Sequence, residues 1–229
     1  MIFSSIDTSI PNRYCAPCFI RNHQTVRTSG WYTAFHGLLS DPKLHEALSD
    51  HEWRLVFYPH YGAQPFLHLF DGLPECIVLA SRHDFDVQQL LMESKILVTD
   101  FSSVSFDFAY MRKPVVYLLP DEERYFADHF QRGYFDFERD GFGPAHRDPM
   151  ATVQSLIRLI QSEARTADQF KTRIDNFFGF HDTDNSRRVL EATLRVCDTG
   201  CAPYGSLTQK AVPTRVPFSD MRYQDGGNQ

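Results

Sequence analysis

The segment at residues 95–119, KILVTDFSSVSFDFAYMRKPVVYLL, constrains the fold more than any other part of the sequence. An apolar run of strand length leads into the polar turn 100–103, a stretch with helical spacing follows, and a second apolar run ends the segment. This order predicts a strand, a turn, a helix and a second strand. Ligands of open parallel sheets bind beyond the carboxyl ends of the strands, where this turn would lie. Free N–H groups at a helix start favour anions, so we expect the turn to hold a nucleotide diphosphate.

Composition and charge limit the classes of function. The chain has 229 residues and 42% hydrophobic content, enough for one sizeable α/β core. A formal net charge of -6 argues against a nucleic-acid partner held by general basicity. No apolar run approaches the roughly 20 residues of a membrane span, and no basic region precedes an apolar one at the N-terminus. We therefore expect a cytoplasmic protein, with contact at the cytoplasmic face of the membrane as an open alternative.

The cysteines do not predict a metal site. Cys15 and Cys18 have the CxxC spacing of many zinc sites, but Cys197 and Cys201 have a CxxxC spacing and lie at the other end of the chain. We expect free thiols and no bound metal.

Taken in order, the chain predicts three regions. Residues 1–30 have no clear period, and the first strand falls either at residues 1–6 or at residues 14–20. Residues 31–197 form the folded domain, and the polar residues 198–229, with several prolines and glycines, predict a disordered tail.

Within the folded domain, strands and helices alternate. Two helices separated by Pro42 are followed by strands at 54–58 and 76–80, with a helical turn at 66–70 between them. A helix at 84–93 has Asp84 as its cap and Val87, Leu90 and Leu91 as its apolar stripe. Beyond the central segment, we expect a helix at 124–130, an extended piece at 133–137 and three helices between 149 and 195. The predicted fold is α/β, a Rossmann-like and mostly parallel sheet covered by helices on both faces.

Three blocks in this order resemble a known family. VTDFSSVSFDFAYMRKPVVYL, preceded by FYPHYGAQPF and followed by HFQRGYFDFERDGFGP, is similar to the C-terminal half of the CDP-glycerol glycerophosphotransferases, which polymerise teichoic acids and related capsule chains. The resemblance covers about residues 31–195. It implies the nucleotide-donor domain of a two-domain enzyme of the GT-B glycosyltransferase type.

The resemblance also implies a reaction and its partners. A terminal hydroxyl of a polyol-phosphate or capsule chain would attack the β-phosphorus of CDP-glycerol, and CMP would leave, with no cofactor and no metal strictly needed. The acceptor domain of the family has no counterpart in these residues, so three interpretations stay open: a fragment of a split gene, a single domain of a larger protein, or one subunit of a two-chain enzyme with a separate acceptor-domain chain. Two alternatives stay open: a donor domain that takes a UDP- or GDP-sugar, and an inactive donor-binding fragment.

The resemblance places five residues in the donor site. His60, in the block FYPHY, would take the hydroxyl proton or stabilise phosphate oxygens, unless it only ends a strand. Ser102 and Ser103 would contact the donor phosphates, and either also suits an ordinary helix cap. Asp107, one helical turn beyond Ser103, would contact ribose or glycerol hydroxyls, or else lie solvated on its helix. Arg21 would clamp phosphates, although the spacing before it departs from the family pattern.

Overall fold

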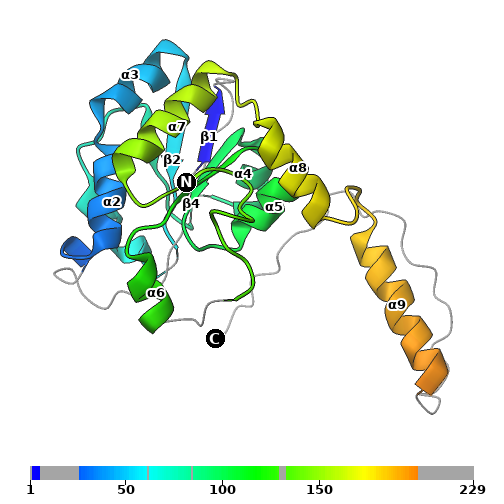
Figure 1. Ribbon diagram of the computed structural model, residues 1–229. Coiled ribbons are helices and arrows are strands. Elements are labelled where there is room, and N and C mark those ends of the chain that lie inside the picture. Colours follow the sequence, from blue (N-terminus) through cyan, green and yellow to red (C-terminus); the bar gives the residue numbers. More distant parts are fainter. Residues whose placement is uncertain (1, 6–25, 61, 84, 129–132, 201–229) are drawn as a thin grey trace, which may run out of the picture. The chain divides into compact units, whose positions relative to one another are not determined.

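The computed structural model describes residues 2–5, 26–60, 62–83, 85–128 and 133–200. The chain divides into two units, Met1–His181 and Asp182–Gln229, and each is described by itself. In the first unit, helices cover both faces of a central sheet (Figure 1). The predicted α/β fold is confirmed.

The sheet is mixed rather than fully parallel. Its strands lie in the order β3-β2-β1-β4-β5-β6, and β1 runs antiparallel to both of its neighbours. The other pairs, β2 with β3, β4 with β5 and β5 with β6, are parallel. The bounds are β1 Ile2–Ser5, β2 Trp53–Phe57, β3 Ile77–Leu79, β4 Ile96–Thr99, β5 Val115–Leu118 and β6 Ala145–His146. The first of the two predicted positions for strand 1 is thus correct, and the second lies outside the described residues.

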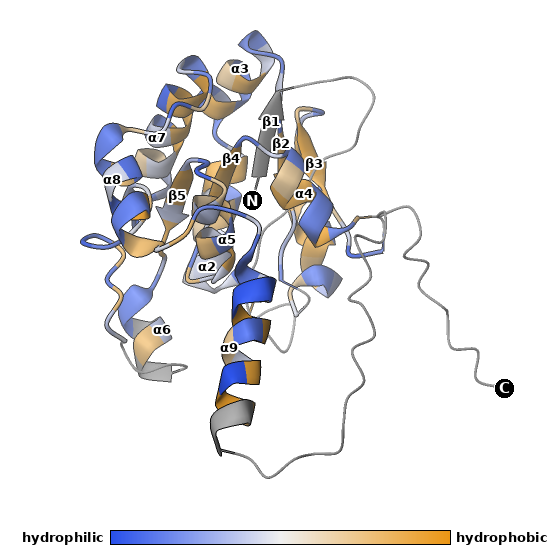
Figure 2. Cartoon of the chain, turned by 90° about the vertical axis from the view of Figure 1, so that its right-hand side faces the viewer, coloured by the Kyte–Doolittle hydropathy of each residue, from blue (hydrophilic) through white to orange (hydrophobic). Residues whose placement is uncertain are grey.

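Alternate side chains of β4 and β5 enter two separate cores, as the pleat of a strand requires. Ile96, Val98 and Val116 belong to the core under α2 (Gly30–Leu39), α3 (Pro42–Asp50) and α7 (Pro149–Gln161), which the 3₁₀ helix η1 (Gln64–Phe70) also enters. Leu97 and Tyr117 belong to the core that includes α4 (Val87–Glu93), α5 (Val104–Tyr110) and α8 (Asp168–Phe177). Figure 2 shows that strands β2, β3 and β4 are mainly apolar and that hydrophilic residues lie on the outer sides of α3 and α7. Helix α6 is Glu122–Asp128.

Helix starts follow the capping side chains. Asp41 accepts hydrogen bonds from the N–H groups of Lys43 (2.8 Å) and Leu44 (3.2 Å), and Pro42 takes the first helical position of α3. Asp86 caps α4 in the same way by accepting from the N–H of Gln89. The predicted start of this helix at residue 84 is therefore wrong, because the cap lies further along the chain.

Two other details differ from the sequence predictions. Val87 is 46% exposed, so the apolar stripe of α4 consists of Leu90 and Leu91 only. Residues 133–137 form no strand, and a turn follows at residues 137–140, where the carboxylate of Asp136 accepts the N–H groups of Glu138 and Arg139.

The second unit contains α9 (Asn185–Gly200), a helix with an apolar stripe and ion pairs along its polar side. Arg187 pairs with Asp184 and Glu191, and Arg188 pairs with Asp182. Its exposed apolar side chains are Val189, Leu190, Leu194 and Val196. The segment 201–229 of the predicted tail lies outside the described residues. Among the helices that the structure describes, none has the length and apolar character to cross a membrane.

Gly143 fixes the approach of the chain to β5, and this contact can be tested. A Cβ at Gly143 would lie 1.6 Å from the carbonyl oxygen of Val115, so Gly143→Ala must displace backbone. We expect a loss of unfolding free energy of at least about 2 kcal/mol, measured by urea denaturation. Gly179→Ala is the matched control, because a Cβ there meets nothing within 4 Å. Equal stability of the two variants would contradict this account.

Candidate functional site

The turn that follows β4 lies at the carboxyl edge of the sheet. Thr99 ends the strand, and the next residue, Asp100, is 2% exposed. The following residues are closer to the surface: Ser102 is partly exposed and Ser103 is exposed, and α5 begins at Val104. A buried strand therefore presents two hydroxyl groups at the edge where α/β sheets bind ligands.

The two serines differ in their local contacts. The Ser102 hydroxyl accepts the N–H of Val104 at 3.4 Å, and its carbonyl oxygen accepts both the N–H and the hydroxyl of Ser105. Ser103 is exposed at the cap position of α5, but its side chain forms no capping hydrogen bond. The cap alternative thus fits Ser102 and does not fit Ser103. Because α5 has only seven residues, an anion here would depend on hydroxyl and turn N–H groups rather than on a long helix dipole.

Asp107 lies one turn beyond Ser103 on α5, as the spacing predicts. The residue is exposed as a whole, yet partial burial of its carboxyl group raises its pKa. Its position is compatible with a contact to ligand hydroxyls and equally with a solvated helix carboxylate.

His60 follows β2 and lies at the same sheet edge, because β2 and β4 both run antiparallel to β1 and hence in one direction. Strand β2 is not adjacent to β4, because β1 lies between them, so the two strands are about 10 Å apart. The N–H of Gly62 donates to His60 Nδ1 at 3.3 Å, which leaves the ring proton on Nε2. Partial burial lowers the pKa of His60, so the ring is neutral near pH 7.

Gln64 joins the loops beyond β2 and β3, and the sequence alone did not indicate this role. Its Nε2 donates to the carbonyl oxygen of Pro59 at 2.8 Å, and its Oε1 accepts the N–H of Arg82 at 3.2 Å. The loop that carries His60 is thereby tied to its neighbour.

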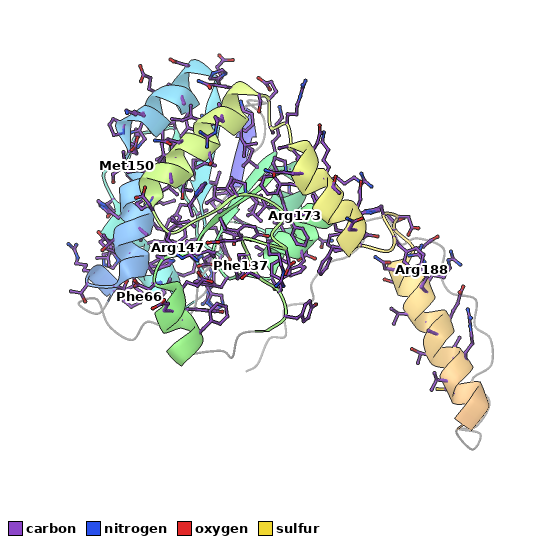
Figure 3. The ribbon with its side chains drawn as sticks, in the orientation of Figure 1. Phe66, Phe137, Arg147, Met150, Arg173 and Arg188 are labelled. Carbon is purple, nitrogen blue, oxygen red and sulfur yellow. The ribbon has the colours of Figure 1, made fainter. Side chains whose placement is uncertain are left out.

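Arg147 is a second residue that sequence reasoning missed. It directly follows β6 and pairs with Glu122 (2.5 Å), at the start of α6, and with Glu138 (2.6 Å). Figure 3 shows Arg147 among the side chains between the sheet and α6. The sequence offered no local signal for this role, because the strand before Arg147 has only two residues and the partners of Arg147 lie 25 and 9 residues away.

Phe101 anchors the serine turn to α6. Its ring stacks on Tyr125, with centroids 3.9 Å apart and planes 9° from parallel. The edges of Phe126 and Phe137 close around it. These contacts hold one end of the turn in place while the serines stay accessible.

Three sequence predictions cannot be placed. Arg21, Cys15 and Cys18 lie outside the described residues. Within the part of the chain that the structure describes, no cluster of three His, Cys, Asp or Glu side chains could hold a metal ion.

The Rossmann-like sheet carries two hydroxyl groups and an imidazole at its carboxyl edge, where ligands of α/β sheets bind. The family model of the CDP-Glycerol:Poly(glycerophosphate) glycerophosphotransferases matches residues 16–195, and the chain belongs to this family. The family predicted from the three sequence blocks is thus confirmed.

Individual relatives agree with the family match. The minor teichoic acid biosynthesis protein GgaB of Bacillus subtilis (strain 168) is 31% identical over 170 residues, which cover 74% of this chain and 18% of GgaB. The teichoic acid poly(glycerol phosphate) polymerase of Bacillus spizizenii (strain ATCC 23059 / NRRL B-14472 / W23) is 30% identical over 145 residues, 62% of this chain and 35% of the polymerase. The matched part of the chain thus spans about a fifth of the length of GgaB and about a third of the length of the polymerase.

A solved structure shows the same fold. The wall teichoic acid polymerase TagF superposes with a TM-score of 0.52 at 24% identity, over 69% of this chain and 38% of TagF. A structure of TagF with the H444N substitution, soaked with CDPG, gives a TM-score of 0.52 at 25% identity.

Asp100 gives a test of the carboxyl edge that does not need a ligand. Burial raises the pKa of Asp100 to about 7, and its Oδ2 accepts no hydrogen bond from any described residue. The folded pKa lies above the unfolded value of about 3.9, so the folded state binds the proton more tightly. Stability should therefore fall as the pH rises from 4 to about 7.

We expect Asp100→Asn to flatten this pH dependence, so that the variant gains at least about 1 kcal/mol relative to the wild type between pH 4.5 and pH 7. Urea denaturation at several pH values measures it. Asp50→Asn, on the exposed end of α3, should leave the slope unchanged. A wild-type slope retained by Asp100→Asn would refute the buried-carboxyl account.

Proposed function

We propose that this chain supplies the donor-binding half of a CDP-glycerol glycerophosphotransferase, which transfers glycerol phosphate to a polyol-phosphate or capsule chain. The observation that carries the proposal is the serine turn: a segment of the family match that ends a central buried strand and exposes Ser103 at the carboxyl edge. Family membership supports the class of donor, and the position of the turn supports the location of its phosphates.

In this proposal the diphosphate of CDP-glycerol lies on the turn. Ser103 donates its hydroxyl to a phosphate oxygen, because no helix cap occupies that side chain. Ser102 contributes mainly through the geometry of the turn, since its hydroxyl accepts from Val104. Asp107 accepts hydrogen bonds from ribose or glycerol hydroxyls one helical turn away, and Arg21 serves as a phosphate clamp.

The reaction is a displacement at phosphorus. The acceptor hydroxyl oxygen forms a bond to the β-phosphorus of CDP-glycerol, and the bond from that phosphorus to the oxygen of CMP breaks. CMP leaves with the bond electrons, and the hydroxyl proton passes to a base. His60, with its proton on Nε2, donates to a phosphate oxygen and stabilises the charge that develops in the transition state.

The acceptor chain needs a surface of its own. We propose that a further domain, on a separate chain or covalently joined, presents the acceptor hydroxyl above the carboxyl edge, as in two-domain transferases. The exposed apolar stripe of α9 supports a role in contact with that partner or with an anionic membrane at its cytoplasmic face.

Donor binding tests the proposal directly. Isothermal titration should show that CDP-glycerol binds and that Ser103→Ala weakens binding about tenfold, since a charge-assisted hydrogen bond to phosphate is lost. Ser49→Ala, on the exposed side of α3, is the control. Titration of CDP, UDP and GDP identifies the base. A preference for UDP or GDP would instead favour a sugar-nucleotide transferase, and no binding at millimolar ligand would overturn the donor site.

A substitution of His60 tests whether this residue acts in donor binding or in the chemical step. With an acceptor domain supplied, His60→Ala should lower the rate of CMP release at least about a hundredfold while CDP-glycerol affinity changes less than about threefold. His36→Ala, a histidine on α2, serves as the control. If His60→Ala abolished donor binding and left the rate per bound donor unchanged, His60 would be a binding residue only.

A further inference from the structure

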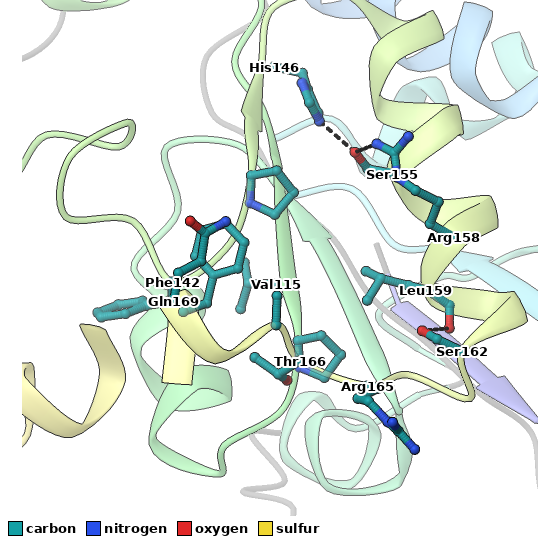
Figure 4. Close-up of a pocket in the computed structure, with 14 residues that line it drawn as sticks. Val115, Phe142, His146, Ser155, Arg158, Leu159, Ser162, Arg165, Thr166 and Gln169 are labelled. Atoms are coloured by element: carbon teal, nitrogen blue, oxygen red, sulfur yellow. Dashed lines mark hydrogen bonds between the residues drawn. The ribbon is translucent and has the colours of Figure 1, made fainter. Parts of the chain in front are cut away.

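A cavity of about 470 Å³ lies at the outer edge of the sheet. None of its lining residues belongs to the serine turn or to the loop of His60. It forms because β6 pairs only with Tyr117 and Leu118, so the beginning of β5 at Val115 has no partner strand on that side. The chain between α7 and α8 closes the other wall (Figure 4).

The walls of the cavity are mainly apolar. They come from the start of β5, the segment before β6 and the facing sides of α7 and α8: Pro114, Val115, Phe142, Pro144, Leu159 and Phe170. A volume of this size accommodates a ring-sized organic molecule, and sites for such molecules combine apolar walls with a few polar groups.

At one end of the cavity, three polar side chains are joined by hydrogen bonds. His146 Nε2 lies 2.8 Å from Ser155 Oγ, and Arg158 Nη2 donates to the same Oγ at 3.0 Å. Ser155 Oγ thus accepts from Arg158 and lies within hydrogen-bond distance of His146 Nε2. Ser155 is 4% exposed, so this arrangement is fixed at the wall of the cavity.

The charges around the cavity are unbalanced. Arg158 and Arg165 form no ion pair with any residue that the structure describes, whereas Arg112, Arg139 and Arg147 all do. The nearby carboxylates have other hydrogen-bond or ion-pair partners: Asp148 accepts the N–H groups that begin α7, and Asp168 pairs with Lys171, although the charge of Arg165 also helps to lower the pKa of Asp168. Figure 4 shows His146 and Arg158 at one end of the cavity and Arg165 at the other.

Burial, and next the charge of Arg158, lower the pKa of His146, while Asp148 acts in the opposite direction. The imidazole is therefore neutral near pH 7 and does not supply the charge at this end. A ligand charge would be met by the guanidinium of Arg158, which uses only one of its five N–H groups on Ser155.

We propose that this cavity is a second ligand site, which binds an organic anion with its phosphate or carboxylate on Arg158 and its apolar body against Pro144, Leu159 and Phe170. Arginine binds either group through two parallel hydrogen bonds, and the apolar wall selects a ligand with a ring or a similar hydrocarbon group over a free inorganic ion. The site shares no residue with the donor site and does not depend on the proposed function.

The test uses 1-naphthyl phosphate and 2-naphthoate as probes, with 1-naphthol and inorganic phosphate as controls that lack the charge or the ring. Isothermal titration should show that at least one naphthyl anion binds at submillimolar concentration and that both controls bind at least about tenfold more weakly. The imidazole resonance of His146, assigned through His146→Gln, should shift on saturation. The two probes distinguish a phosphate from a carboxylate ligand.

Variants locate the binding. Arg158→Gln and Arg165→Gln should each weaken the better probe, the first by about tenfold or more, while Arg54→Gln, an exposed arginine on β2, should not. Both cavity arginines are exposed, so their substitution leaves the core intact, and thermal melts verify the fold of each variant.

Three results would overturn the proposal: no binding of either naphthyl anion at millimolar concentration, binding that Arg158→Gln leaves unchanged, or binding that Ser103→Ala weakens as much as Arg158→Gln does. The last result would place the probe on the serine turn instead. A failure of CDP-glycerol to bind would leave this test unaffected.

Discussion

The complete burial of β4 and β5 on both faces is the constraint on which the rest of the structure depends. All eight residues of the two strands are buried, and their side chains contribute to two cores on opposite sides of the sheet. Each face then requires its own layer of helices, and the chain must leave the sheet at the strand ends to reach them. Charged side chains are absent from these strands, and Thr99 and Tyr117 carry their only side-chain hydroxyl groups. Polar side chains gather at the carboxyl edge, where the turn after β4 releases Ser102 and Ser103 to the surface.

Much of this architecture could be predicted from the sequence, because continuous apolar runs and helical stripes are local signals. The parts that could not be predicted depend on partners far along the chain. The direction of β1 is set by pairing with β2 and β4, which its own residues do not encode. The strand β6 has two residues and is held by backbone bonds such as that from the N–H of Tyr117 to the carbonyl of Pro144, so it leaves almost no periodic signal.

The same division applies to the candidate site. The serine turn was predictable because its residues are contiguous and belong to a family block. The hydrogen bonds of Gln64 to the loops beyond β2 and β3, and the pairing of Arg147 with Glu122, could not be predicted. Each of them joins segments that are distant in sequence. The near-complete burial of Asp100 and its raised pKa follow only from the packing around the end of β4. Site residues that are contiguous in the sequence are therefore easier to predict than the residues that hold them in position from distant segments.

Helix α7 connects the carboxyl edge with the cavity at the sheet's outer edge. It begins two residues after Arg147, near the carboxyl ends of the strands. Its 13 residues span about 20 Å toward the opposite ends of the strands. Val153, Leu156 and Ile160 bury one side of it in the core shared with α2 and α3, while Ser155 and Arg158 turn toward the cavity. A helix held along its whole length by buried side chains shifts only as a unit, because a close-packed core does not deform locally. The serine turn and the loop of His60 lie on other elements, so a ligand in the cavity that leaves α7 in place also leaves the carboxyl edge unchanged. The cavity therefore fits a ligand that stabilises the fold better than a second substrate, since nothing on its walls reaches the serine turn.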